Sequence, residues 1–271
     1  MDTQTLKTFL LLAKLKNFTQ TAEQLYVAQS TVTNRIADLE AELGTPLFVR
    51  SKRSVTLTPE GLSFEQYARR ILELEQTAFQ EMNSIRNFSH TTHIGTTNTI
   101  YECYLYPQIK EWLKEHPRHA LKITIGHSQD LLCALQDGIM DQVYCYTPLR
   151  KKGIFCEVFA IDELILVTGT GQNQYQNGIY KSDLIHSDYL FCNFALQEVG
   201  SFIRELFPPH FLFRLEIDNS TKLIPYLLDI GGISFLPESL AKPYLENGAL
   251  TKIPLLDFEA PKISCYKIQK V

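Results

Sequence analysis

Residues 62–88 contain neither Gly nor Pro, and this long amphipathic stretch decides how the rest of the chain can be arranged. A helix of about 25 residues is roughly 38 Å long, more than the width of one small domain. Its apolar residues recur at nearly coiled-coil spacing, at Phe64, Tyr67, Ile71, Leu74, Ala78, Met82, Ile85 and Phe88. An exposed helix cannot bury such a stripe alone, so the pattern predicts self-association. Packing onto its own domain is the alternative. The helix also divides the chain into residues 1–58, a linker at 59–88 that starts at Pro59, and residues 91–271.

Residues 1–58 are typical of a compact, all-helical module. Apolar positions at helical spacing predict a first helix over about residues 3–16. Thr19 is expected to cap a short second helix that ends near Tyr26, and Ser30 to cap a third that stops at Gly44. Two helices joined by about three residues, the second with a polar outer face, form the helix-turn-helix pattern.

The polar side chains near the third helix and the hairpin that follows it suggest an interface with double-stranded DNA. The hairpin has two short apolar strands around a basic turn, which is the composition of a wing that contacts phosphates. Although the net charge is −4, residues 1–58 hold seven Lys and Arg against five Asp and Glu, a balance of +2. The residues predicted to contact DNA are Thr19, Gln29, Ser30, Thr31, Thr33, Asn34, Arg35, Arg50, Lys52 and Arg53.

The same segment resembles the LysR-type transcriptional regulators over about sixty residues. The resemblance is carried by Phe18–Ala22, Gln29–Thr33, Ile36, Leu39-Glu40, Leu43-Gly44, Leu47–Arg50 and Leu57–Gly61. It implies that the third helix reads the major groove and that the wing contacts the backbone. It also implies a homodimer or homotetramer formed through the linker helix, promoter DNA and RNA polymerase as partners, and a small-molecule effector. Asn34-Arg35 lies where the family varies, so the operator sequence does not follow from the resemblance.

Residues 91–271 alternate between strand-like and helix-like segments, which predicts a doubly wound parallel α/β sheet. The resemblance implies that this part is built like a periplasmic solute-binding protein, with two lobes. Lobe I is expected at about residues 91–148 and 238–271, and lobe II at about 160–236, with the chain crossing near Thr147–Arg150. The predicted fold class is therefore α/β, preceded by an all-α winged helix-turn-helix module.

Polar residues stand where strands of this sheet give way to helices. Ligands of α/β proteins bind at the carboxyl ends of strands, where helix N-termini present free N–H groups and partial positive charge. A small carboxylate or another anion is therefore the expected effector, with no other cofactor. Helix capping alone is the competing explanation for these residues. The predicted effector residues are Thr97, Asn98, Thr99, Ser128, Gln129, Asn193, Asn219, Ser220 and Thr221.

Enzymatic and metal-binding functions find little support in the sequence. It has none of the glycine-rich, G-x-S-x-G or H-E-x-x-H motifs that mark common active sites. Two H-x-x-H spacings occur, at His90/His93 and His116/His119, but neither is expected on a regular helical face or has a Cys nearby. We predict neither catalysis nor a metal site.

Two alternatives stay open beside a regulator controlled by an effector. One is a redox-sensing regulator that uses one of six scattered cysteines, although core packing explains most of them better. The other is a cleft domain that binds a solute without contacting DNA. The amino terminus lacks a secretory signal pattern and no apolar run is long enough to span a membrane, so a cytoplasmic protein is expected.

Overall fold

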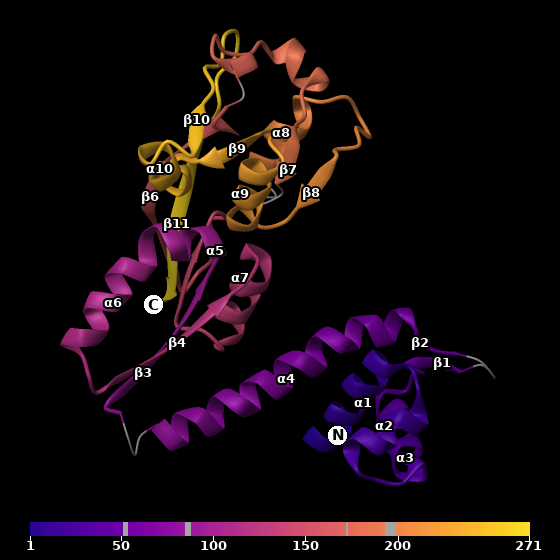
Figure 1. Cartoon of the computed structure of the whole chain (residues 1–271). Coiled ribbons are helices and arrows are strands. Elements are labelled where there is room, and N and C mark those ends of the chain that lie inside the picture. Colours follow the sequence, from indigo (N-terminus) through magenta and orange to yellow (C-terminus); the bar gives the residue numbers. More distant parts are fainter. Residues whose placement is uncertain (51–53, 85–87, 172, 193–198) are drawn as a thin grey trace. The chain divides into compact units, whose positions relative to one another are not determined.

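The computed structural model describes residues 1–50, 54–84, 88–171, 173–192 and 199–271. The chain forms two compact units, one made of residues 1–88 and 137–139 and the other of 89–136 and 140–271 (Figure 1). Each unit is described by itself below.

The first unit is built on three helices that share one apolar core. These are α1 (Thr3–Leu15), α2 (Phe18–Leu25) and α3 (Gln29–Leu43). Leu6 and Phe9 of α1 pack against Ile36 and Leu39 of α3, and all four side chains are almost completely buried. Gly44 ends α3 with a φ of 69°, as its sequence position predicts.

The starts of α2 and α3 differ from the sequence predictions. Asn17 caps α2, because its side-chain oxygen accepts the Gln20 N–H at 3.0 Å, and Thr19 lies inside the helix. Ala28 precedes α3 without a side-chain cap, so Ser30 lies in the first turn. Asn and Thr both make good caps, and the choice depends on where the preceding helix stops. Here α1 ends in a left-handed residue, Lys16.

A two-stranded antiparallel wing and a long helix complete the first unit. The wing pairs β1 (Phe48–Arg50) with β2 (Val55–Leu57), and α4 spans Pro59–Ser84. The first half of α4 packs on its own module through residues such as Ala68. Its second half leaves large apolar side chains exposed, at Leu74, Phe79 and Met82. Packing onto its own domain therefore accounts for only part of the predicted stripe, and Ile85 lies outside the described residues.

The second unit contains a mixed seven-stranded sheet and a separate two-stranded sheet. Parallel strands β3 (His90–Thr96), β4 (His119–Ile125) and β5 (Gln142–Cys145) lie at one end of the large sheet. Side chains alternate across a strand, and this places the two flanking helices on opposite faces. Helix α6 (Tyr106–Glu115) packs on the face of Ile94, and α7 (Ser128–Asp137) packs on the face of Gly95. This end of the sheet is doubly wound, as predicted.

One long strand joins the two lobes of the second unit. The first half of β6 (Ile154–Gly169) pairs with β11 (Lys262–Lys270), and its second half pairs with β9 (Ile233–Pro237) and β10 (Leu250–Lys252). The register against β11 shifts at Phe159, where one extra residue lets the strand bend. The chain thus crosses within β6, and not near Thr147–Arg150 as the sequence predicts, and it returns through β11. Because these pairings are antiparallel, the whole sheet is mixed.

The rest of the second lobe is built around a parallel pair of short strands. The second lobe also contains two short 3₁₀ helices (Asn173–Tyr175 and Lys181–His186), β7 (Leu190–Cys192), α8 (Val199–Glu205), β8 (Leu215–Ile217), α9 (Ser220–Asp229) and α10 (Glu238–Glu246). In the first lobe, α5 (Asn98–Ile100) and a π-helix (Tyr101–Leu105) precede α6. Helix α5, the π-helix and α6 follow one another without a break, so one helix runs over residues 98–115.

Candidate functional site

The start of α3 and the neighbouring part of α2 present four of the ten predicted DNA-contacting side chains to solvent. Thr19, Gln29, Ser30 and Asn34 are exposed, and Thr31 is half-buried. The Thr19 hydroxyl lies 3.4 Å from the Gln29 amide oxygen, and this weak contact joins the first turns of α2 and α3.

Two of the predicted residues on α3 bind within the module instead. The Thr33 hydroxyl donates to the Gln29 carbonyl oxygen at 3.0 Å, one helical turn back. Arg35 is half-buried and donates to the Thr8 hydroxyl of α1 at 3.1 Å. As it lies, Arg35 holds α3 against α1 and does not extend outward.

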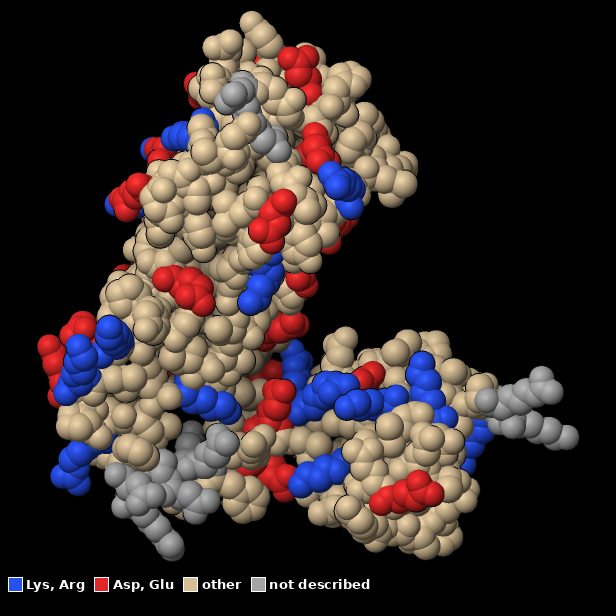
Figure 2. Space-filling model, viewed as in Figure 1, with Lys and Arg blue, Asp and Glu red and all other residues tan. Residues whose placement is uncertain are grey.

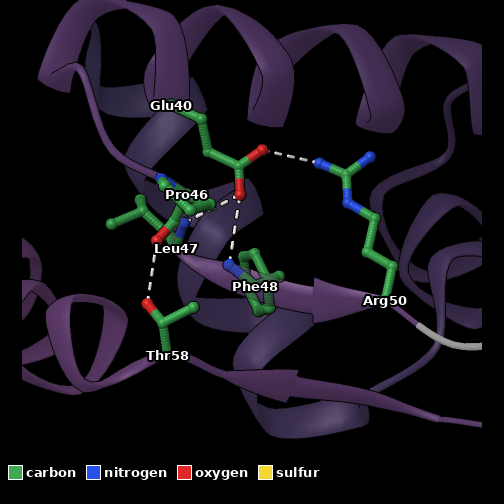
Figure 3. Close-up of polar contacts among 6 residues, drawn as sticks. All are labelled: Glu40, Pro46, Leu47, Phe48, Arg50 and Thr58. Atoms are coloured by element: carbon green, nitrogen blue, oxygen red, sulfur yellow. Dashed lines mark hydrogen bonds and ion pairs between the residues drawn. The ribbon is translucent and has the colours of Figure 1, made fainter.

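The wing is held against α3 by the Glu40 side chain, a residue that carries part of the family resemblance but for which the sequence predicted no role (Figure 3). One carboxylate oxygen accepts the Leu47 N–H at 2.8 Å and the Phe48 N–H at 3.1 Å, and the other accepts from the Arg50 guanidinium at 2.7 Å. Below it, the Thr58 hydroxyl donates to the Pro46 carbonyl oxygen at 2.8 Å. Both ends of the hairpin are therefore fixed by side chains.

Arg50 is the predicted DNA-contacting residue whose surroundings differ most from the expectation. Besides pairing with Glu40, its guanidinium lies 5.2 Å from the centre of the Phe18 ring, a cation–π distance. Lys52 and Arg53 lie outside the described residues. Figure 2 shows Lys and Arg side chains gathered along one side of this unit, toward the wing.

In the second unit, the structure brings together the starts of two helices from different lobes. The Asn98 amide of α5 donates to the Thr221 hydroxyl of α9 at 2.8 Å and lies 3.4 Å from the Asn219 side-chain oxygen. The Thr99 and Ser220 hydroxyls are 2.6 Å apart. Asn219 also caps α9 by accepting the Thr221 N–H at 3.1 Å. These residues, with Thr97 just before them, form one cluster, which is called the cleft below. The two helix starts that meet in it are more than 100 positions apart in the chain.

Thr97 is the cleft residue whose polar group has no protein partner. The residue is only 8% exposed, and its buried hydroxyl makes no hydrogen bond within the part of the chain that the structure describes. It stands at the N-cap position of α5 without capping the helix. A buried hydroxyl left in this way costs free energy unless a water molecule or a ligand satisfies it.

The other predicted effector residues are Ser128, Gln129 and Asn193. Ser128 and Gln129 start α7 as predicted, with Gln129 exposed. His127, just before them, lies 3.8 Å from the Asp218 carboxylate of the other lobe. Asn193 is outside the described residues.

A buried carboxylate lies where β6 passes between the lobes, and sequence patterns gave no signal for it. Asp162 accepts hydrogen bonds from the Tyr104 hydroxyl at 2.9 Å and from the Glu163 N–H at 2.9 Å. It also accepts the Ser239 hydroxyl and, at 3.2 Å, the Ser239 N–H. Asp162 therefore ties the π-helix, β6 and the start of α10 together.

Burial suppresses the ionisation of three of the six cysteine thiols. Burial raises the pKa of the Cys145 thiol to about 11 and that of Cys265 to about 12, and it also raises the pKa of Cys103. All six cysteines are free thiols. Within the described ranges, no three His, Cys, Asp or Glu side chains are grouped so that they could hold a metal ion. No helix among the described residues is long and apolar enough to cross a bilayer.

Two family models together match almost the whole chain. Residues 3–62 match the bacterial regulatory helix-turn-helix protein of the lysR family, and residues 86–268 match the LysR substrate binding domain. The chain belongs to the LysR family. It is a DNA-binding transcriptional regulator with an effector-binding substrate domain, as the sequence predicts.

Comparisons with individual proteins agree with this assignment. The HTH-type transcriptional regulator CitR of Bacillus subtilis is 25% identical over 99% of this chain and 93% of its own length. HdfR of Yersinia enterocolitica is 29% identical over 94% and 87%. The crystal structure of CbnR, a LysR family transcriptional regulator, is 20% identical with a TM-score of 0.74, covering 100% of this chain and 93% of that one. A further structure, of full-length CbnR with its target DNA, gives a TM-score of 0.71 at 20% identity over the same shares of the two chains.

Proposed function

We propose that this LysR-type regulator reads promoter DNA with the first two turns of α3 and contacts the adjacent DNA backbone with the wing. The support is the exposed row of uncharged polar side chains at Gln29, Ser30 and Asn34, with Thr19 beside it. Such groups pair with base edges in the major groove. Lys52 and Arg53 supply phosphate contacts, and Arg50 positions the wing through Glu40. RNA polymerase is a further proposed partner, and the protein acts in the cytoplasm because its target is the chromosome.

The regulator is proposed to work as a homodimer or homotetramer formed through α4. The exposed apolar side chains of its second half, Leu74, Phe79 and Met82, need a cover, and a second copy of the same helix supplies one. Two-fold symmetry then places two half-sites about one helical turn of DNA apart.

The effector is proposed to bind in the cleft, and the observation that carries this is the unpartnered hydroxyl of Thr97. The hydroxyl lies at the N-terminal end of a continuous helix, where an anionic group gains from the helix dipole. A small carboxylate or another anion that accepts a hydrogen bond from Thr97 is the proposed class. The role is regulatory and not catalytic, and no other cofactor is proposed.

The redox alternative receives less support than the effector. A sensing cysteine needs a low pKa and exposure, because the thiolate is the reactive form. Burial instead raises the pKa of Cys103, Cys145 and Cys265, which keeps these thiols protonated and unreactive.

A footprint of the full-length protein on the DNA upstream of its own gene tests the proposed function. At two salt concentrations, we expect protection of two half-sites that weakens steeply with salt, because phosphate contacts release counterions. Thr97→Val is then expected to keep the footprint and to lose its response to the effector. An unchanged response would contradict the cleft proposal, and protection without any salt dependence would contradict the proposed role of the wing.

A further inference from the structure

A cavity lies in the first lobe, between α6 and the sheet. Its volume is about 280 Å³, and its lining comes from β3, β4, β5 and the helix that runs over residues 98–115. It shares no lining residue with the cluster of Thr97, Asn98 and Thr99 at the start of that helix. The cavity, called the α6 pocket below, is therefore separate from the cleft.

The aromatic wall of the α6 pocket is held in place before any ligand arrives. The Trp112 ring stacks on the His116 ring at 4.5 Å between centroids and meets the edge of the His119 ring at 4.7 Å. The His119 Nε2 atom in turn lies 2.8 Å from the hydroxyl of Thr92, another lining residue. A rigid aromatic wall lowers the entropy cost of binding a flat molecule against it.

The chemistry of the lining selects for an uncharged ligand. Ile94, Leu105 and Leu121 supply apolar surface beside Trp112. None of the residues that line the pocket, all of them within the described ranges, is acidic or basic. An ion in this space would lose part of its hydration without gaining a counter-charge.

The polar groups of the pocket point to an amide-like partner. The Tyr144 hydroxyl donates to the Gln142 side-chain oxygen at 3.3 Å, which leaves the amide N–H₂ of Gln142 as a donor. Gln108 adds a second amide, and Trp112 adds an indole N–H. We propose that the α6 pocket binds a neutral, planar molecule that carries an aromatic ring and a carboxamide or similar group.

A ligand in this pocket would contact the helix over residues 98–115, whose N-terminal end lies at the cleft. Leu105 lines the pocket and is the last residue of the π-helix that follows α5. The Tyr144 carbonyl oxygen accepts the Thr97 N–H at 3.2 Å. Such π-helical segments are frequent at functional sites. The α6 pocket is thus placed to act on the cleft through α5 and β5.

The single tryptophan of the chain makes the proposal directly testable. Trp112 fluorescence of the full-length protein is titrated with benzamide and with benzoate, which have the same shape but differ in charge. Benzamide is expected to change the emission with a dissociation constant of about 1 mM or tighter, and benzoate to bind at least about tenfold more weakly.

Variants on either side of α6 locate the site. Leu121→Phe fills the pocket and is expected to weaken benzamide at least about tenfold. Leu113→Phe, at an exposed position on the same helix that does not line the pocket, is expected to have no effect. If Leu121→Phe fails to fold, as judged by circular dichroism, Ile109→Phe replaces it. No response to benzamide, equal binding of benzoate, or an unchanged response in the filled variant would each overturn the proposal.

Discussion

Replacing Arg50 by Gln separates two roles of this residue, contact with DNA and positioning of the wing. In the structure its guanidinium pairs with Glu40 at 2.7 Å and lies over Phe18. The ion pair is partly exposed, so it contributes at most about 1 kcal/mol, and the ring contact adds about 0.5–1 kcal/mol. We expect Arg50→Gln to lower the stability of the module by about 1 kcal/mol.

Glu40→Ala is expected to cost more, because it leaves two backbone donors without an acceptor. Leu47 and Phe48 are almost completely buried, and their N–H groups both point at Glu40. Each lost bond of this kind costs about 1–3 kcal/mol, and together we expect about 2–6 kcal/mol. Denaturation of the full-length variants checks this order. A Glu40→Ala, Arg50→Gln double variant should lose less than the sum of the two single losses, because the pair shares one contact.

The salt dependence of promoter binding distinguishes the two roles of Arg50. Each phosphate contact contributes about 0.9 to the slope of log affinity against log salt. If Arg50 only positions the wing, Arg50→Gln weakens binding at every salt concentration and leaves the slope unchanged. Arg53→Gln, at a residue that the sequence predicts to contact DNA, is the control and should lower the slope by about 0.9. The same loss of slope in Arg50→Gln would refute the positioning role.

Four other substitutions or treatments have defined expected outcomes. Thr97→Val removes a buried unpartnered hydroxyl and should raise the free energy of unfolding slightly, by about 1 kcal/mol or less, as thermal denaturation can measure. The same replacement of a hydrogen-bonded buried threonine would lower it. Tyr26→Asn should stabilise the module by about 0.5–1 kcal/mol in denaturation, because Tyr26 has a φ of 55° and is 95% exposed. Burial and the nearby His90 and His116 lower the pKa of His119 below 6.5, because they disfavour the charged imidazolium in the folded protein. Neutral His119 therefore contributes its full stabilisation above pH 6.5, and this stabilisation is lost as the pH falls through the lowered pKa. The melting temperature should therefore drop less on acidification in His119→Asn than in the wild type. Alkylation of Cys265 by iodoacetamide at neutral pH should be slow until the protein unfolds, as mass spectrometry can measure.

Local patterns predicted the elements of the first unit well, and they failed where a choice depends on neighbouring residues. The helix stop at Gly44 follows from the freedom of glycine at positive φ, which is a local property. The cap at Asn17 in place of Thr19 depends on the left-handed turn at Lys16, which no propensity indicates.

Residues that are distant in the chain account for the parts of the site that the sequence did not predict. A basic residue in a wing looks like a DNA contact until its partner is known, and Glu40 meets Arg50 only once the hairpin folds back on α3. The helix starts of the cleft were predicted from strand-to-helix passages, because parallel strands end at one edge of a sheet. Their direct contacts, such as that between Thr99 and Ser220, require the bend of β6 between the lobes.

These direct contacts limit how an effector can act on the cleft. The lobes are already joined by the bond from Asn98 to Thr221, so an effector changes the lobe arrangement only through its different affinities for the open and closed states. A neutral hydrogen bond contributes about 0.5–1.5 kcal/mol, and Asn98→Ala should therefore favour opening by roughly twofold to tenfold. Hydrogen exchange in the first turn of α9, in protein without effector, should be faster by the same factor. Exchange as slow as in the wild type would show that this bond does not hold the lobes together, and the closed state would then rest on other contacts, such as those between Thr99 and Ser220 and around Asp162.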